Sequence, residues 1–209
     1  LVCFQGFIGW YMVSSGLVDR VDVSHYRLAV HLMIAFIILS LILWNYLDLK
    51  NLIFPEKNIN FYLSLSLLFI VYLQISIGAF VSGMDAGKIY NTWPMMGNNY
   101  FPDDNKISNL FEFSVFNDPS LVQFLHRNLA YLILIFYFFI FFKIYLNNLN
   151  RLYGPIKLIG LFLLLQVLLG IFTLLNGAQI YLASMHQISS IFLVSSCIYF
   201  LYLNKQVSN

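Results

Sequence analysis

The amino-acid sequence predicts an all-α integral membrane protein with six transmembrane helices. Composition is the first reason: of the 209 residues, 60% are hydrophobic and 10% are charged, whereas soluble domains carry about 25% charged residues. The second reason is that the apolar residues gather in six continuous runs, and about 20 apolar residues suffice for a helix to cross a bilayer. A transmembrane β-barrel would show alternating apolar and polar residues instead. The spans are therefore predicted to be helices.

The predicted spans cover most of the chain, at residues 1–17, 26–49, 60–83, 121–146, 155–176 and 180–203. The first is the shortest, and it begins at Leu1 without the charged segment that opens a signal peptide. We therefore expect the chain to be a fragment with further helices upstream. Two cysteines, Cys3 and Cys197, lie inside apolar runs, and we expect both to be buried.

The loops differ in charge, and this difference predicts the orientation of the helices. One set of loops carries an excess of basic residues: Lys50, Lys57, Lys143, Arg151, Lys157 and Lys205. The positive-inside rule places this set in the cytoplasm or its organellar equivalent, so the loops at 18–25 and 84–120 face outward. Loop 84–120 is long and rich in aromatic residues, which favours a packed or interfacial segment with a function. The formal net charge of +2, without a basic stripe, argues against a nucleic-acid partner.

An internal repeat organises the predicted helices. The pattern Gln-x-x-x-Gly occurs three times, as Gln5 and Gly9, Gln74 and Gly78, and Gln166 and Gly170. Each occurrence precedes an outer loop and a returning helix with a histidine near its outer end: His31, His126 and His186. Such units predict parallel repeats around an axis along the membrane normal. A fourth unit upstream would complete eight helices in two four-helix halves.

The repeated pattern places glutamine and glycine on one face of each helix. Glycine allows a neighbouring helix to approach closely, so packing is one interpretation of the pattern. An amide in hydrocarbon needs a hydrogen-bond partner. The roles of Gln5, Gln74 and Gln166 stay open between a bond from helix to helix and a bond near a cofactor.

Three histidines at equivalent repeat positions predict a shared function, because ionisable residues inside spans are rare and usually functional. Zinc prefers four ligands, and no cluster of Cys, Asp or Glu accompanies these histidines in the sequence. Two histidines on facing helices can instead hold a haem iron from both sides. Arg127 follows His126 directly, and Arg27 precedes His31 by one turn. Each arginine is predicted either to pair with a haem propionate or to be an interfacial anchor.

Four segments in combination resemble the haem A synthase family: GAFVSGMDAGKIYNTWPMMG, VQFLHRNLAYL, YRLAVHL and LQVLLGIFTLLNGAQIYLASMHQ. The resemblance runs over about residues 1–203. It implies eight helices in two similar four-helix halves. Residues 1–50 would be the remainder of the amino-terminal half, on the side of the substrate haem. Residues 51–209, with the outer loop 84–120, would form the carboxy-terminal half, on the side of a b-type haem.

The resemblance also implies the chemistry, which is oxidation of the C8 methyl group of haem O to a formyl group. The product, haem A, serves terminal oxidases. His126 and His186 match the axial ligands of haem b, with Arg127 beside them, and His31 matches a ligand of the substrate haem. The family's other histidine and its presumed catalytic glutamate correspond to upstream positions, so we expect the chain as given to be incomplete as a catalyst.

The family further implies a bacterial cytoplasmic membrane or a mitochondrial inner membrane, with the histidines toward the outer face. The implied partners are haem O, membrane lipid, a haem O synthase or oxidase assembly factors, and a second copy of the chain.

Two other functions fit a helical membrane bundle. A cytochrome b-like electron-transfer protein would also use pairs of histidines, but it commonly places two histidines on one helix at different depths. A transporter built from parallel repeats would need broken helices and a polar site at mid-membrane. Gln74 and Gln166 are the main polar groups there, so we rank the transporter last.

Overall fold

The computed structural model describes residues 1–14, 23–50 and 59–205 of the chain. These ranges fold into α-helices and short 3₁₀ turns: α1 (Val2–Ser14), α2 (His25–Leu49), α3 (Phe61–Gly83), η1 (Ala86–Lys88), η2 (Ile107–Phe111), η3 (Phe113–Asn117), α4 (Pro119–Leu146), η4 (Asn150–Leu152), α5 (Tyr153–Leu175) and α6 (Ile180–Leu203). No strand occurs within them beyond an isolated bridge between Met96 and Asn99. The predicted all-α class is confirmed.

Five helices, α2 to α6, are long and apolar enough to cross a membrane. The shortest of them, α3 and α5, have 23 residues each, which at about 1.5 Å per residue exceeds the hydrocarbon thickness of about 30 Å. Helix α1 has 13 residues and covers only about 20 Å at the same rise. The chain is therefore a multi-pass membrane protein, and the first predicted span is a shorter apolar helix. Residues 15–17 of that span lie outside the described residues.

Side-chain caps set where two of the spans begin. The Asn60 side chain accepts a hydrogen bond from the backbone N–H of Tyr62 at 2.9 Å, at the start of α3. Asp118 does the same for Leu121 at 2.9 Å, and Pro119 occupies the first turn of α4. Both arrangements satisfy N–H groups that a helix start leaves unpaired. As a result, α4 begins two residues before the apolar run that predicted it.

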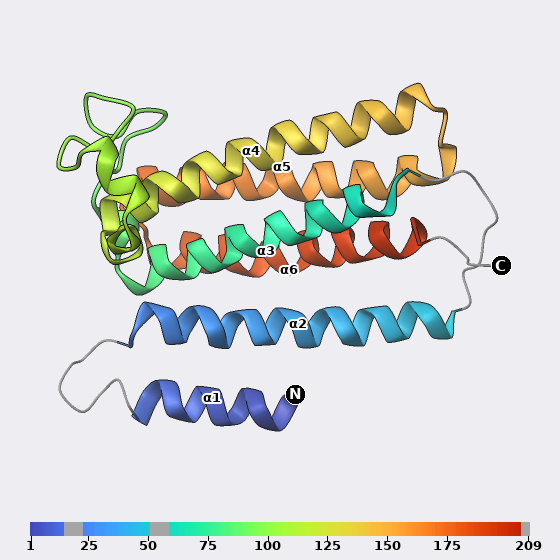
Figure 1. Ribbon diagram of the computed structural model, residues 1–209, viewed down its shortest axis with the longest axis horizontal. Helices are drawn as coiled ribbons and strands as arrows, with labels where there is room; N and C mark the ends of the chain where they lie inside the picture. The colour runs from blue at the N-terminus through green and yellow to red at the C-terminus, as the bar shows by residue number, and fades with distance from the viewer. Residues whose placement is uncertain (15–22, 51–58, 206–209) are drawn as a thin grey trace.

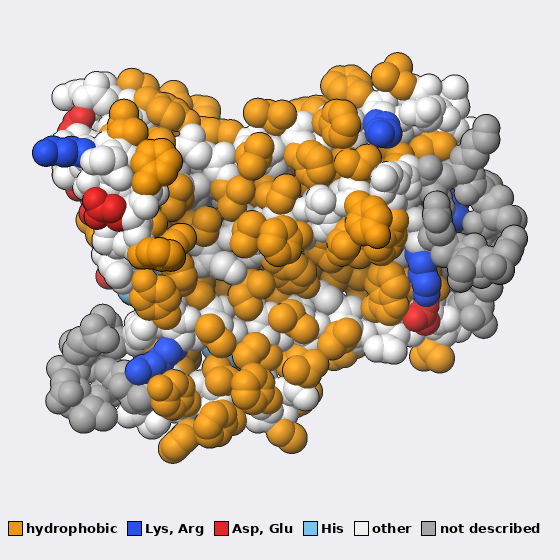
Figure 2. Space-filling model, viewed as in Figure 1, with side chains coloured by type: hydrophobic (Ala, Val, Ile, Leu, Met, Phe, Trp, Pro, Cys, Tyr) orange, Lys and Arg blue, Asp and Glu red, His pale blue; other side chains and the backbone are white. Residues whose placement is uncertain are grey.

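The helices lie side by side, with α5 along α6 and α3 packed against α2, α4 and α6 (Figure 1). Helix α1 packs on α2 at the edge of the bundle. Hydrophobic side chains cover the visible face between the two ends, where the charged side chains gather (Figure 2). This distribution suits a surface that faces lipid. Cys197 is buried as predicted, but the prediction for Cys3 is wrong, because α1 has one helix neighbour and leaves Cys3 exposed.

The described connections between the helices lie at the two ends of the bundle. The segment 84–118, the start of α2 and the turn between α5 and α6 lie at one end, and the turn between α4 and α5 lies at the other (Figure 1). Lys57 lies outside the described residues. The long segment is packed in part, since Met96 and Val115 are 0% and 4% exposed, whereas Phe111 and Phe113 on its short helices are 87% and 95% exposed.

Candidate functional site

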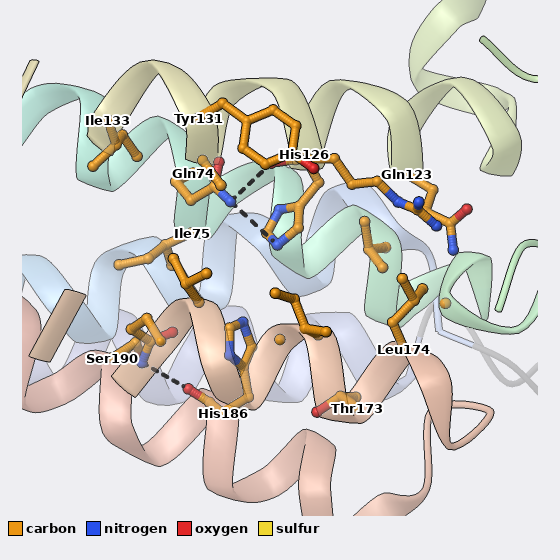
Figure 3. A pocket seen from close by; sticks show the side chains of 18 of the residues that line it. Gln74, Ile75, Gln123, His126, Tyr131, Ile133, Thr173, Leu174, His186 and Ser190 are labelled. Carbon is orange, nitrogen blue, oxygen red and sulfur yellow. Dashed lines mark hydrogen bonds between the residues drawn. The ribbon is translucent and has the colours of Figure 1, made fainter. Parts of the chain in front are cut away.

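Gln74 on α3 joins the histidine of α4 by two hydrogen bonds. Its Nε2 donates to the backbone carbonyl of His126 at 3.0 Å and lies 3.2 Å from His126 Nε2 (Figure 3). Because a carbonyl only accepts hydrogen bonds, the amide nitrogen must be the atom that faces it. The glutamine therefore bonds from helix to helix and, in the same place, to the ring of a candidate ligand.

The glycine of the repeat explains how the two helices come this close. A Cβ atom added to Gly78 would lie 3.1 Å from Cε1 of His126. The position one turn after Gln74 therefore has to stay free of a side chain so that the imidazole can rest on α3. Glutamine and glycine, four residues apart on one face, together form a seat for one histidine.

The same seat recurs in the other two repeats. Gln5 Nε2 lies 3.0 Å from the carbonyl of His31 and 3.2 Å from its Nε2. A Cβ on Gly9 would approach the His31 ring to 3.0 Å, and a Cβ on Gly170 would approach the His186 ring to 3.2 Å. The predicted repeat is therefore a structural unit, in which one helix supplies the seat and the next supplies the histidine.

The third seat differs in one contact. Gln166 Nε2 donates to the backbone carbonyl of His186 at 3.0 Å and to the hydroxyl of Ser189 at 2.6 Å. The Ser189 hydroxyl in turn donates to the same carbonyl at 2.9 Å. An amide nitrogen carries two N–H groups, so these two bonds use both of them.

The fold brings His126 and His186 together. Their ring centroids are 6.5 Å apart, with the ring planes at 77°. Imidazole nitrogens bind metals at about 2 Å, so two rings on opposite sides of one metal ion would have centroids roughly 6 Å apart. The observed separation of the ring centroids is close to this value.

Two adjoining cavities flank the histidine pair. One, of about 200 Å³, extends toward α4 and is lined by Trp93, Arg127, Tyr131 and mostly aliphatic side chains. The other, of about 380 Å³, extends toward α2 and includes Leu28, Leu32 and Asp85 in its walls. Both include His126, His186, Gln74 and Gln166 in their walls, and Figure 3 shows both imidazoles among the side chains that line one of them. Apolar walls with a few convergent polar groups are typical of cofactor sites.

The donor set fits haem better than a lone metal ion. Nδ1 of His126 and Nδ1 of His186 are buried without a hydrogen-bond partner, and buried polar groups of this kind are rare unless a ligand engages the ring. Within the described ranges no three residues of the types His, Cys, Asp and Glu could hold a metal together. Two opposed imidazoles with apolar space around them suit an iron whose other four ligands come from a porphyrin.

A comparison with protein families matches residues 1–198 to the COX15-CtaA family, described as cytochrome oxidase assembly protein. The chain belongs to this family. Among its relatives are proteins named heme A synthase from Pelagibacter ubique, with 46% identity over 98% of this chain, and from Flavobacterium johnsoniae, with 42% over 95%. A third, from Wolbachia pipientis, is 38% identical over 98% of the chain. The chain spans 60%, 60% and 58% of these relatives, respectively.

In this family member the long segment 84–118 is fastened at the first cavity by Arg127. Its guanidinium donates to the backbone carbonyls of Thr92 at 2.9 Å, Met95 at 3.2 Å and Tyr90 at 3.0 Å. The indole N–H of Trp93 donates to the Tyr131 hydroxyl at 3.0 Å. These bonds connect the segment to α4 on the wall of the cavity, and no pattern in the sequence indicates them beyond the position of Arg127 next to His126.

A carboxylate farther along the segment is held ionised. Burial of Asp104 acts to raise its pKa, but hydrogen bonds from Ser120, Tyr90 and Asn105 outweigh burial and leave the pKa below its usual value of 3.8. Ser120 belongs to the first turn of α4, and its hydroxyl lies 2.6 Å from Asp104. Asp104 therefore ties the segment to the start of α4.

The other predicted residues lie apart from the pair. His31 sits in the first seat, on α2, and lines neither of the two cavities. Arg27 stacks over the ring of Tyr11, with Cζ 4.9 Å from the ring centroid. Asp85 lies on the wall of the second cavity and forms an ion pair with Lys88 at 2.8 Å.

Proposed function

We propose that this chain is part of a haem A synthase, which oxidises the C8 methyl group of haem O to a formyl group and so gives haem A for terminal oxidases. The observation that carries the proposal is the pair of imidazoles whose ring centroids lie 6.5 Å apart, on the shared walls of two cavities. Membership of the cytochrome oxidase assembly family and the name heme A synthase on its relatives support the reaction.

His126 and His186 are the residues that we assign as axial ligands of a haem b. Iron held in this way supplies one-electron chemistry, while the chain holds the two imidazoles in place and keeps water from the apolar walls. Arg127 is the candidate for a propionate. A guanidinium has five N–H groups, and carbonyls take three of them. Its Nε is buried without a partner, so donors remain for a carboxylate.

His31 is our candidate for the substrate haem, because its seat repeats that of His126. In this division residues 1–50 belong to the half that receives haem O, and residues 51–209 form the half with haem b and the outer loop 84–120. We place the protein in a bacterial cytoplasmic membrane or a mitochondrial inner membrane with the histidine end outward, in keeping with the basic residues at the opposite end. The proposed partners are lipid, a haem O synthase or oxidase assembly factor, and a second copy of the chain.

Haem binding is the first test. The protein is purified in detergent from a haem-producing host, and its haem is measured by the pyridine haemochrome assay. We expect about one b-type haem per chain and loss of most of it in His126→Ala and in His186→Ala. His25→Ala is the matched control and should retain the haem, because His25 lies at the start of α2, outside the three seats and outside both cavities. Equal haem content in all four proteins would refute the assignment of the ligands.

The reaction is tested separately in a bacterium that accumulates haem O because its own haem A synthase has been deleted. Expression of the protein at the full length of its heme A synthase relatives should produce haem A or its hydroxylated precursor in the extracted haems. A full-length protein that carries haem but leaves haem O unchanged would refute the enzyme and favour the electron-transfer protein.

A further inference from the structure

We propose that the corner of the first cavity formed by Gln123 and Arg127 binds an O–H group. This group donates a hydrogen bond to Oε1 of Gln123 and accepts one from Nε of Arg127. Two sources carry this chemistry, the acid form of a haem propionate and a water molecule. The inference rests on the proposed haem site and assigns Gln123 as a further binding residue beside Arg127.

Gln123 brings a buried acceptor to this corner. It lies on α4, three residues before His126, and its side chain lines the first cavity (Figure 3). The residue is 3% exposed, and its Nε2 donates to the backbone carbonyl of Tyr90 at 3.1 Å. Because a carbonyl only accepts hydrogen bonds, this contact identifies the amide nitrogen, and the other amide atom is Oε1. Oε1 is buried and has no hydrogen-bond partner among the described residues.

Arg127 offers the complementary donor at the same place. Its guanidinium donates to the carbonyls of Thr92, Met95 and Tyr90, and its Nε is buried without a partner in the described part of the chain. Residues four apart share one face of a helix. Arg127 and Gln123 both line the first cavity and both bond the carbonyl of Tyr90, at 3.0 and 3.1 Å. An unused donor and an unused acceptor therefore meet at one corner of the cavity.

These two atoms select the chemistry of the ligand. Buried donors and acceptors without partners are costly, and native proteins rarely leave them so. A carboxylate would accept from Nε of Arg127, but it would set a negative oxygen against Oε1 of Gln123, since neither of these groups has a proton to donate. An aliphatic group would serve neither atom. A hydroxyl serves both, because its oxygen accepts from the arginine and its O–H donates to the glutamine.

Both sources of an O–H group suit the proposed haem site. Gln123 precedes His126 by three residues, about 4.5 Å along the helix axis, so the corner lies close to the proposed iron ligand. A propionate that carries a proton supplies the O–H directly. A water molecule needs two or more polar partners when buried and finds them in the two side chains, while its second O–H stays available for a carboxylate. In either case Gln123 supplies the acceptor that a guanidinium, which only donates, lacks.

The test compares haem b with its dimethyl ester, in which both propionates are esterified and lack an O–H. Each is titrated into the protein from a haem-deficient host, in detergent, and the reading is the ratio of the two dissociation constants, ester over haem b. If a propionic acid is the ligand, Gln123→Met should lower this ratio about tenfold, as expected for one lost hydrogen bond. A merely structural effect, through the lost bond to Tyr90, would weaken both ligands alike and leave the ratio unchanged.

Thr173→Val is the matched control for the loss of a polar group from the first cavity. Its hydroxyl lines the same cavity but already donates to the Leu169 carbonyl at 2.7 Å, so the ratio should stay at the wild-type value. A fall in Thr173→Val as large as that in Gln123→Met would overturn the proposal. A rise of the ratio in Gln123→Met would also overturn it, because an ionised carboxylate held against Oε1 would produce that result.

A high-resolution electron cryomicroscopy map of the haem-loaded protein separates the second source. Water is the ligand if Gln123→Met leaves the ratio unchanged and the map shows an isolated oxygen within hydrogen-bond distance of Gln123 Oε1 and Arg127 Nε. An unchanged ratio without any oxygen at these two atoms would overturn the proposal. A failure of the haem site itself has a different signature, because the wild type would then bind neither haem b nor its ester, or would bind them equally well in His126→Ala.

Discussion

Removal of Arg127 should release the segment 84–118 from α4. The three hydrogen bonds to the carbonyls of Tyr90, Thr92 and Met95 measure 3.0, 2.9 and 3.2 Å. Hydrogen bonds to a charged group contribute about 1.5–3 kcal/mol each when buried, and partial exposure to water lowers this to about 1 kcal/mol each. Arg127→Ala should therefore destabilise the closed segment by about 3 kcal/mol, which corresponds to a roughly 100-fold change in an opening equilibrium.

Hydrogen exchange of the detergent-solubilised protein measures this opening directly. The most informative amides are those of Met96, which donates to the Asn99 carbonyl at 2.7 Å, and Gly97, which donates to the Thr92 hydroxyl at 2.9 Å. Both should exchange about 100-fold faster in Arg127→Ala, while amides in the middle of α4 keep their protection.

The control for the loss of a positive charge is Lys106→Ala, on the exposed part of the same segment. It should leave the exchange of Met96 and Gly97 unchanged. If Arg127→Ala exchanged no faster than Lys106→Ala, the reasoning that the guanidinium fastens the segment would be refuted.

Two further outcomes follow from the described contacts. Gly78→Ala should reduce haem content and thermal stability together, because the new Cβ would lie 3.1 Å from the His126 ring. Gly154→Ala, where nothing lies within 4 Å of the added Cβ, should be neutral or stabilising by up to about 1 kcal/mol; equal losses in both would refute the seat. Asp104 has a lowered pKa, so its contribution to stability is complete above the usual value of 3.8 and is lost as the pH falls through the lowered pKa. Thermal unfolding between pH 2 and 6 should therefore show a decline at the acid end that Asp104→Asn lacks, and an identical decline in the variant would contradict this account.

The spans could be predicted from the sequence because their signal is local. Continuous apolar runs give the helices α2 to α6 to within a few residues. The largest shifts in a start are two residues, at α4 and α5, and the shift at α4 comes from the cap at Asp118 and from Pro119. The repeat of glutamine, glycine and histidine can also be seen in the sequence, because glutamine and glycine keep a fixed spacing along one helix and the histidine a similar position on the next. His126 and His186 could therefore be singled out as a candidate pair from the sequence, and the structure brings their rings together.

The hydrogen bonds of the site could not be predicted in the same way, because they depend on contacts between elements far apart in the chain. The sequence left the role of Gln74 open between a hydrogen bond to another helix and a hydrogen bond near a cofactor. In the structure both of its contacts are with His126, 52 positions away, one with the backbone carbonyl and one with the ring. The guanidinium of Arg127 reaches carbonyls 32 to 37 residues upstream. Backbone carbonyls carry no signature in the sequence, so the hydrogen bonds of Arg127 to the segment 84–118 could not be predicted.

The three seats also show why a repeated module suits a site for a planar cofactor. His31, His126 and His186 lie seven, eight and seven residues into α2, α4 and α6, and at about 1.5 Å per residue this is nearly the same depth from the start of each helix. Helices in register at this depth bring His126 and His186 to one level, where we propose that they hold a haem. The common glutamine and glycine fix that level, and they leave the residue three positions after each histidine free to vary. A change there, such as Leu129 in α4 against Ser189 in α6, alters the hydrogen bonds of the seat without moving the helix.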